Sequence, residues 1–279
     1  MRLSDFLILS LLGLLVFQGG LSTVVAASAT DPLDVSLTAD QILQRMRKAM
    51  DTADSGKQVQ TFLRKTVVTD LKADGEIRKR TYKTYRAYTD GRDQQLLEIN
   101  GQPASTRDIA KDRAHNLERQ QRYLHRQDRK KSSQNSKLMA KNMDLFRRKF
   151  IARRMENEML DGRPAYTIGF SPDSTYELEN GFVDRLMNAV HGKVWVDTKE
   201  HHIARMEMKL NRSVSFLGGL AGVLREIRID IHQKQLAPNL WVDEKITAYF
   251  DVRVLFKSYL FRLSSRAVDF EAVVSKHGP

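Results

Sequence analysis

Apolar and charged residues alternate along the second half of the chain, and this two-residue period predicts β-strands. Successive side chains of a strand point to opposite faces of a sheet. Repeated alternation over many strands therefore predicts an antiparallel sheet with one apolar, buried face and one charged face. The apolar positions that define three of these segments are Ala204, Met206, Met208, Leu210, Ile227, Ile229, Ile246 and Phe250.

The first half combines one helix with a short series of strands. Thr38 and Gln41 have the spacing of a capping box, which places the start of an amphipathic helix at residue 39. A tight hairpin turn is favoured at Gly75, because glycine tolerates a positive φ. The pattern predicts a helix over 39–53, followed by strands over 59–71, 77–88 and 94–99.

Residues 106–154 lose the two-residue period, because charged residues with Leu, Met, Gln and Ala replace most glycines and β-branched residues. This composition predicts helices over 106–131 and 137–150, joined by a polar connection. The first helix has only a thin apolar stripe and is expected on the surface. The second has a distinct apolar face, which consists of Met139, Met143, Phe146 and Phe150.

Strand signals return after residue 151 and continue towards the C-terminus. Residues 176–190 are expected to form a short helix or a loop. The chain as a whole is predicted to be mainly β, of the α+β class, with a single strongly curved antiparallel sheet or incomplete β-barrel of about ten strands. Two or three helices are then available to cover its concave face. The predicted strands of this part are 151–160, 165–170, 193–197, 202–210, 227–231, 246–254 and 258–270.

The N-terminal residues have the features of a secretory signal peptide. An unbroken apolar run from Phe6 to Phe17 is too short to span a bilayer but matches the apolar region of such a signal. We therefore expect residues 1–29 to be removed by cleavage near Ala27 or Ala29, and residues 30–279 to form one periplasmic domain. Because the chain contains no cysteine, it is expected not to be lipid-anchored.

The net charge of +12 is concentrated in the predicted helical segment, where residues 107–154 contain sixteen Lys or Arg and five Asp or Glu. A solvated helical surface is the default interpretation of such a segment. An anionic membrane surface is a second candidate, because the second helix also has an apolar face. Nucleic acid is the least favoured partner for an exported protein, and none is predicted. The candidate contacts to an anionic surface are Lys130, Lys131, Lys141, Arg147 and Arg148.

Groups that could carry catalysis do not form a recognised arrangement. The seven histidines lack the His-Glu-x-x-His spacing that places two metal ligands on one helix face, and a cysteine nucleophile is excluded. His201 and His202 are expected at a hairpin tip, where a solvated turn is favoured over a metal site. The sequence therefore predicts that the protein is not an enzyme and has no metal and no cofactor.

Residues 216–224 are apolar but contain three glycines, so they favour neither a helix nor a strand. Two interpretations have equal weight. The segment is either a flexible lip that closes over a cavity or touches a membrane, or a buried connection packed against the sheet.

Several motifs together resemble the LolA/LolB-like superfamily of periplasmic lipoprotein carriers. They include the capped N-terminal helix, the turn at Asn100-Gly101, the strand pair through 161–166, and above all Gly192-Lys193-Val194-Trp195-Val196-Asp197 followed by 203–207. The resemblance covers residues 38–271. It implies a strongly curved, incomplete antiparallel barrel whose concave side is plugged by helices and holds acyl chains.

The resemblance and the apolar pattern together suggest a periplasmic carrier or sensor that binds lipoprotein acyl chains or another lipid in the concave cavity. The alternative is an envelope interaction or stress-sensing module that binds a protein or an anionic glycolipid through its basic face. Ordinary core packing remains the commoner explanation for each apolar position taken singly. The candidate cavity wall comprises Ala204, Met206, Met208, Leu210, Ile227, Ile229, Ile246, Phe250, Met139, Met143 and Phe146.

Overall fold

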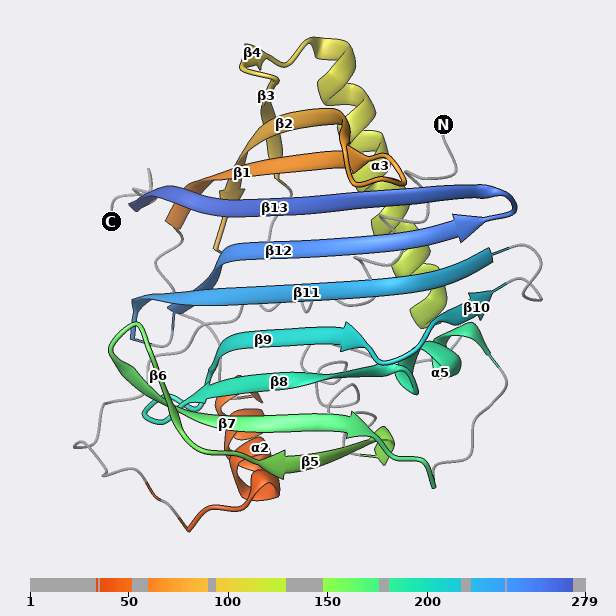
Figure 1. Ribbon diagram of the computed structural model, residues 1–279. Coiled ribbons are helices and arrows are strands. Elements are labelled where there is room, and N and C mark those ends of the chain that lie inside the picture. The colour runs from red at the N-terminus through yellow and green to blue at the C-terminus, as the bar shows by residue number, and fades with distance from the viewer. Residues whose placement is uncertain are drawn as a thin grey trace.

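One antiparallel sheet dominates the fold (Figure 1). The structure, a computed structural model, describes residues 34, 36–51, 60–89, 94–128, 148–175, 181–216, 222–238 and 240–272. Within these residues the sheet has thirteen strands: β1 Gln60–Leu71, β2 Ile77–Tyr88, β3 Gln95–Ile99, β4 Gln102–Pro103, β5 Phe150–Arg154, β6 Glu158–Leu160, β7 Arg163–Pro172, β8 Val190–Asp197, β9 Ile203–Leu210, β10 Val214–Phe216, β11 Gly222–Ala237, β12 Leu240–Val254 and β13 Lys257–Ala272.

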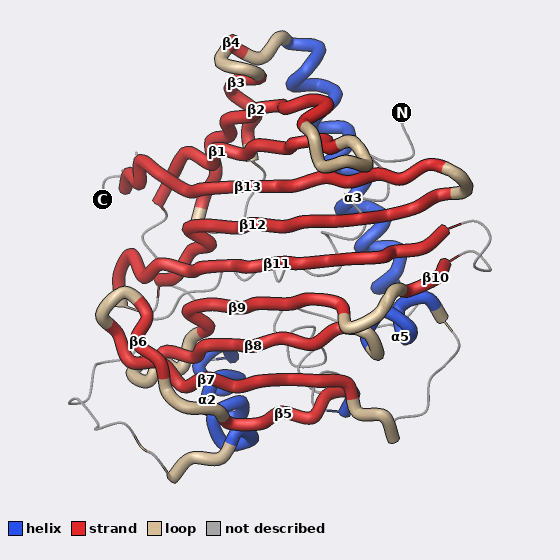
Figure 2. The backbone as a smooth tube through the Cα atoms, in the orientation of Figure 1, coloured by secondary structure: helices blue, strands red, loops and turns tan. Residues whose placement is uncertain are grey.

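The order of the strands shows that the sheet is open. The main path runs β4-β3-β2-β1-β13-β12-β11-β9-β8-β7-β5, while β10 pairs with β11 and β6 pairs with β7. The first long strand, β1, therefore pairs with the last strand, β13. Almost every other neighbour in the sheet is also a neighbour in sequence, as expected for successive hairpins (Figure 2).

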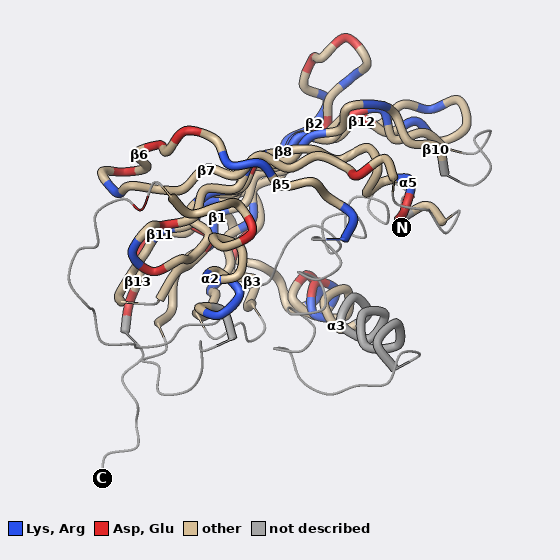
Figure 3. Tube along the Cα trace, turned by 90° about the horizontal axis from the view of Figure 1, so that it is seen from below, with Lys and Arg blue, Asp and Glu red and all other residues tan. Residues whose placement is uncertain are grey.

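Three helices accompany the sheet in the described part of the chain: α2 Ala39–Asp51, α3 Thr106–Asp128 and α5 Phe182–Met187. The sheet curls, and α2 and α3 lie on its concave side (Figure 3). The predicted capping box forms at α2, because the Gln41 N–H donates to Thr38 Oγ1 at 3.3 Å and the Thr38 N–H donates to Gln41 Oε1 at 2.8 Å. Below, the concave side is called the core face and the opposite side the convex face.

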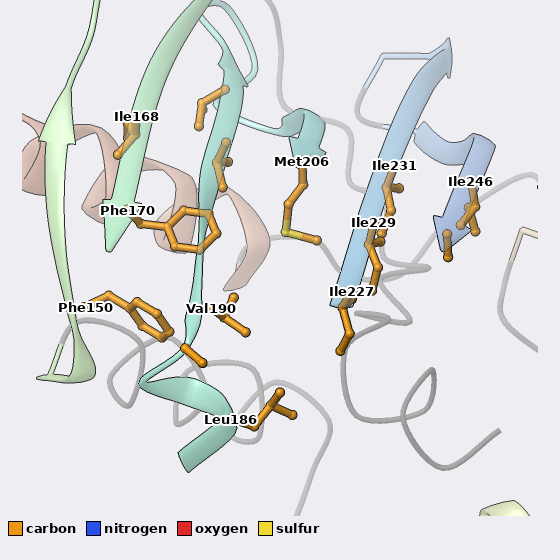
Figure 4. Close-up of a cluster of buried hydrophobic side chains, with 14 of the residues drawn as sticks. Phe150, Ile168, Phe170, Leu186, Val190, Met206, Ile227, Ile229, Ile231 and Ile246 are labelled. Carbon is orange, nitrogen blue, oxygen red and sulfur yellow. The ribbon is translucent and has the colours of Figure 1, made fainter. Parts of the chain in front are cut away.

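The apolar core lies between the core face and α2. Ile42 and Met46 of α2 are almost fully buried against this face. Phe250 and Phe261 stack with ring centroids 4.8 Å apart on neighbouring strands. Figure 4 shows core side chains of β7, β8, β9 and β11 pointing into one shared interior. The prediction of a curved antiparallel sheet with one buried apolar face is therefore confirmed.

The count of about ten strands was too low. The strands β4, β6 and β10 have only two or three residues each, which is too short to show a two-residue period. The predicted single strand over 151–160 is instead the two strands β5 and β6, because Met155, Glu156 and Asn157 leave the ladder between them.

Phe150 was predicted on the apolar face of a helix, and this was wrong. It begins β5 and is buried, with its ring packed edge-on against Phe170 at 5.5 Å. A short apolar run fits a helix face and a strand equally well, so the pairing with β7 decides. The rest of that predicted helix up to residue 147 lies outside the described residues. The first helix is present as α3, with Ile109 and Leu117 exposed as expected.

Candidate functional site

The register of the sheet places one row of core-face residues side by side across eight strands. This row changes from polar residues on β2, β1 and β13 to apolar residues on the strands from β12 to β7. The change occurs between Ser265 on β13 and its partner Ile246 on β12. The hydroxyl groups of Ser265 and Thr66 share a hydrogen bond at 3.0 Å. In order across the sheet the row contains Lys83, Thr66, Ser265, Ile246, Ile231, Met206, Val194 and Ile168.

The apolar part of the core face contains most of the residues predicted to line a cavity. Met206, Ile227, Ile229, Ile246 and Phe250 are buried in the core cluster. Ala204, Met208 and Leu210 are partly buried. The structure thus brings seven of these residues together on one face, and their role as a ligand wall remains a prediction. Ala204 is the exception, because the β8–β9 register shifts between Trp195 and Val196, so that Ile203 and not Ala204 pairs with core-facing Val196. Met139, Met143 and Phe146 lie outside the described residues.

A polar cluster, defined here as Arg64, His202, Gln233 and Asp243, adjoins the apolar part. Arg64 Nη2 donates to the Asp243 carbonyl oxygen at 3.3 Å, Gln233 Nε2 donates to Asp243 Oδ1 at 2.7 Å, and Gln233 Oε1 lies 2.9 Å from His202 Nε2. Burial raises the pKa of Asp243 and lowers the pKa of Arg64. Sequence spacing could not have revealed this cluster, because its members come from β1, β11, β12 and the β8–β9 loop.

One donor of the polar cluster has no partner in the part of the chain that the structure describes. Arg64 Nη1 is buried and makes no hydrogen bond within the described part of the chain. A buried guanidinium N–H without an acceptor is costly, and most buried polar groups in proteins are satisfied. This group can therefore donate a hydrogen bond to an anionic or carbonyl oxygen of a bound molecule without giving up an existing hydrogen bond.

Helix α3 is joined to the polar end of the core face through Asp112. Asp112 Oδ1 accepts hydrogen bonds from Lys83 Nζ and from the Tyr85 hydroxyl, both at 3.1 Å. The Asp112 side chain is only 13% exposed, so this ion pair is shielded more than a typical surface pair. These contacts fix the N-terminal half of α3 on the same side of the sheet as α2.

His202 was expected in a solvated turn, and this was wrong. Its ring stacks on the indole of Trp241 at 5.2 Å, and burial lowers its pKa to about 4. Trp241 is itself held by Glu200, which accepts its indole N–H at 2.7 Å, and by the Arg163 guanidinium 5.3 Å from the ring centre. The local sequence gave no signal of this burial, because Trp241 is supplied by a distant strand.

The Gly-x-Val-Trp-Val-Asp motif has a structural explanation at each position. A Cβ on Gly192 would lie 1.9 Å from the Glu207 carbonyl oxygen, so only glycine fits there. Val194 and Val196 enter the core, while Trp195 lies on the convex face with the Arg205 guanidinium 4.7 Å from its ring centre. Buried Asp197 accepts the backbone N–H groups of the turn that follows β8.

The convex face carries two basic rows that sequence reasoning did not predict. The alternation showed that charged residues face outward, but the register of non-local strands decides which charges meet. Basic row one contains Lys65, Arg266, Lys245, His232 and Arg205, and basic row two contains Arg80, Arg262, Arg228 and Lys209. Between these two basic rows lies a row that contains Thr247, Ser264, Asp230 and Glu207.

The predicted contacts to an anionic surface fall mostly outside the described residues. This applies to Lys130, Lys131, Lys141 and Arg147. Arg148 is described and exposed. The next residue, Lys149, is instead buried and forms an ion pair with Asp184 of α5, so the basic segment is not solvated along its whole length.

The described residues contain neither a candidate metal site nor a candidate membrane-spanning helix. No three His, Cys, Asp or Glu side chains there gather closely enough to hold a metal ion. Among the same residues, no helix combines the length and the apolar character that crossing a membrane requires.

Comparison with known proteins gives structural matches only. No protein-family model and no curated protein sequence matches the chain. A Vibrio parahaemolyticus domain, provisionally described as an outer membrane lipoprotein-sorting protein, has 11% sequence identity and a TM-score of 0.31, with 85% of this chain and 93% of that chain covered.

Two other matches have similar extent. A LolA superfamily protein from Nitrosomonas europaea has 11% identity and a TM-score of 0.28, with 88% of this chain and 96% of that chain covered. The Pseudomonas aeruginosa MucA/MucB complex contributes a chain with 7% identity and a TM-score of 0.27, with coverage of 85% and 99%.

Proposed function

We propose that this protein is a periplasmic carrier or sensor that binds lipoprotein acyl chains or another lipid on the core face of its sheet. It acts by binding and exchange, without catalysis. The proposal includes export by the signal peptide at 1–29, which N-terminal sequencing of the exported protein would test. A mature N-terminus within a few residues of Ala27 or Ala29 is the expected result.

The observation that supports this proposal most directly is Arg64 Nη1, which lies beside an apolar surface and has no hydrogen-bond partner among the described residues. A lipid with an acidic head group has an oxygen for this donor and an acyl chain for the neighbouring apolar residues. Gln233 and Asp243 of the polar cluster are two and three residues away from Ile231 and Ile246 along the same strands. Each buried methylene group of an acyl chain contributes about 0.8 kcal/mol to binding.

Titration of the purified protein with a fluorescent fatty acid tests the proposal. We expect saturable binding that Arg64→Gln weakens by about tenfold or more, because a hydrogen bond to a charged group contributes roughly 1.5–3 kcal/mol. The matched control is Arg266→Gln, which removes the same group from the convex face of the neighbouring strand and should leave the affinity unchanged. Equal affinity for Arg64→Gln and the parent protein would contradict the role of Arg64.

A second candidate function is an envelope interaction module that recognises a protein or an anionic glycolipid through basic surface residues. The two basic rows favour it, because cations such as Lys65, Arg266 and Lys245 are exposed and have no ion-pair partner in the described part of the chain. Reversal to Glu of Arg266 and Lys245, or of Arg147 and Arg148 in the helical segment, should then weaken partner binding at low salt.

A further inference from the structure

The β12–β13 hairpin ends in a two-residue loop of bulky apolar residues. Val254 pairs with Lys257 at the end of the ladder, so Leu255 and Phe256 form the loop. Leu255 is 60% exposed and Phe256 is fully exposed. The hairpin extends past its neighbour β1, which pairs with β13 no further than Leu260. Figure 1 shows the loop at one end of these long strands.

The backbone of this loop disfavours the side chain that it carries. Leu255 has a φ of 54°, a conformation in which two-residue hairpin loops favour Gly, Asn or Asp. Leu255 is the one bulky apolar residue with a positive φ in the described chain. The fold thus exposes a leucine where a polar residue would be less strained. The other non-glycine residues with a positive φ there are Asn100, Asp161, His201 and Asp269.

Two exposed cations flank the tip, one on each side of the sheet. Arg253 lies between core-facing Val252 and Val254, so it belongs to the convex face. Lys257 pairs with Val254 and therefore lies on the core-face side. Both side chains are exposed, and neither forms an ion pair with an acid in the described residues. The apolar tip is therefore bracketed by positive charge.

These features fit the surface of a lipid bilayer better than the surface of a second protein. A stable protein interface buries about 800 Å² on each partner, whereas one phenylalanine buries about 150–250 Å². The tip alone is therefore too small for such an interface. A bilayer needs no complementary shape, since apolar side chains enter its head-group boundary while Lys and Arg remain among anionic head groups.

We propose that the β12–β13 tip is a membrane-docking element. Leu255 and Phe256 enter the head-group boundary of an anionic bilayer, and Arg253 and Lys257 contact lipid phosphates. This element is distinct from the basic segment at 106–154. It also does not depend on a lipid being carried on the core face.

Flotation of the full-length protein with vesicles of phosphatidylglycerol and phosphatidylethanolamine tests the proposal. The double variant Leu255→Asn/Phe256→Gly should lower the partition coefficient by about tenfold or more. Its melting temperature should stay about the same or rise, because Asn adopts the positive φ of position 255 more readily than Leu does. A tip that serves only the folded structure would give the reverse, namely a lower melting temperature with unchanged vesicle binding.

Three further variants sharpen this test. Met159→Ser removes an apolar side chain that is 64% exposed on β6, and should leave vesicle binding unchanged. Arg253→Gln/Lys257→Gln should weaken binding to the anionic vesicles but not to phosphatidylcholine vesicles. Phe256→Trp provides a fluorescent reporter, because the two native tryptophans are buried. Its emission should shift to the blue when anionic vesicles are added.

Two outcomes would overturn the proposal. The first is vesicle binding by Leu255→Asn/Phe256→Gly equal to that of the parent protein. The second is a parent dimer in sedimentation that the same variant converts to a monomer, since the tip would then contact a second copy. Fatty-acid affinity reports separately on the core face. Tip variants should retain it, so failure of the docking proposal is distinguishable from failure of the proposed function.

Discussion

Two rows of residues, one position apart in every strand, give this sheet two opposite surfaces. The core-face row that includes Ile246, Ile231 and Met206 is largely buried. Its neighbour, basic row one, runs through Lys245, His232 and Arg205 on the convex face. A shift of one residue in the pairing of any of these strands would exchange the two sets. The apolar residues therefore fix the register, and the register in turn aligns the cations.

The two rows differ in what holds them together. In the core-face row, contacts between apolar side chains of neighbouring strands stabilise the folded protein. In basic row one, Arg266 lies directly opposite both Lys65 and Lys245, and like charges in such positions are destabilising. A surface that is tolerated at a cost to folding is a reasonable place to look for an anionic partner.

The largest expected effect comes from removing a core-face aromatic residue. Phe250→Ala should lower the free energy of unfolding by about 3–5 kcal/mol, because Phe250 is fully buried and stacked on Phe261. Its sequence neighbour Tyr249 faces the convex side, with the Arg228 guanidinium 5.6 Å from its ring centre. Tyr249→Ala should cost about 1 kcal/mol. Urea denaturation measures both, and equal losses would contradict the assignment of faces.

A pH-dependent effect should arise in the polar cluster. His202 has a folded pKa of about 4 against an ordinary value of 6.5, so between these values the unfolded chain binds a proton that the folded chain does not. The free energy of unfolding should therefore fall as the pH is lowered from 6.5 to 4, by roughly 3 kcal/mol from this group. Carboxylates also titrate near the lower limit, so His202→Gln is the control.

The pH titration of urea denaturation in both proteins isolates this contribution. His202→Gln should lose much less stability across the same interval than the parent protein. An identical decline in the two proteins would mean that His202 is not buried in its neutral form.

The smallest expected effect concerns basic row one. Arg266→Ser should raise the free energy of unfolding by a few tenths of a kcal/mol at low ionic strength. The reason is that the substitution removes a positive charge that lies directly opposite both Lys65 and Lys245. The gain should disappear near 1 M salt, where the Debye length is about 3 Å. A loss of stability at low salt would show that Arg266 has a favourable contact that outweighs the repulsion.

Local patterns predicted the features that depend on residues close in sequence. The capping box of Thr38 and Gln41 formed as expected, and so did the alternation that places Met206 in the core. The missed features depend on distant residues. His202 is partly buried against Trp241, and Phe150 is a strand residue because it pairs with β7. The polar cluster and the basic rows likewise follow from strand register, which a single sequence does not reveal.

Native mass spectrometry of the protein purified without detergent would detect a lipid held on the core face. We expect a bound species with the mass of a lipid or lipoprotein acyl group, lost in Arg64→Gln and retained in Arg266→Gln. A parent protein that carries no such species and also fails to bind a fluorescent fatty acid would contradict the proposed function.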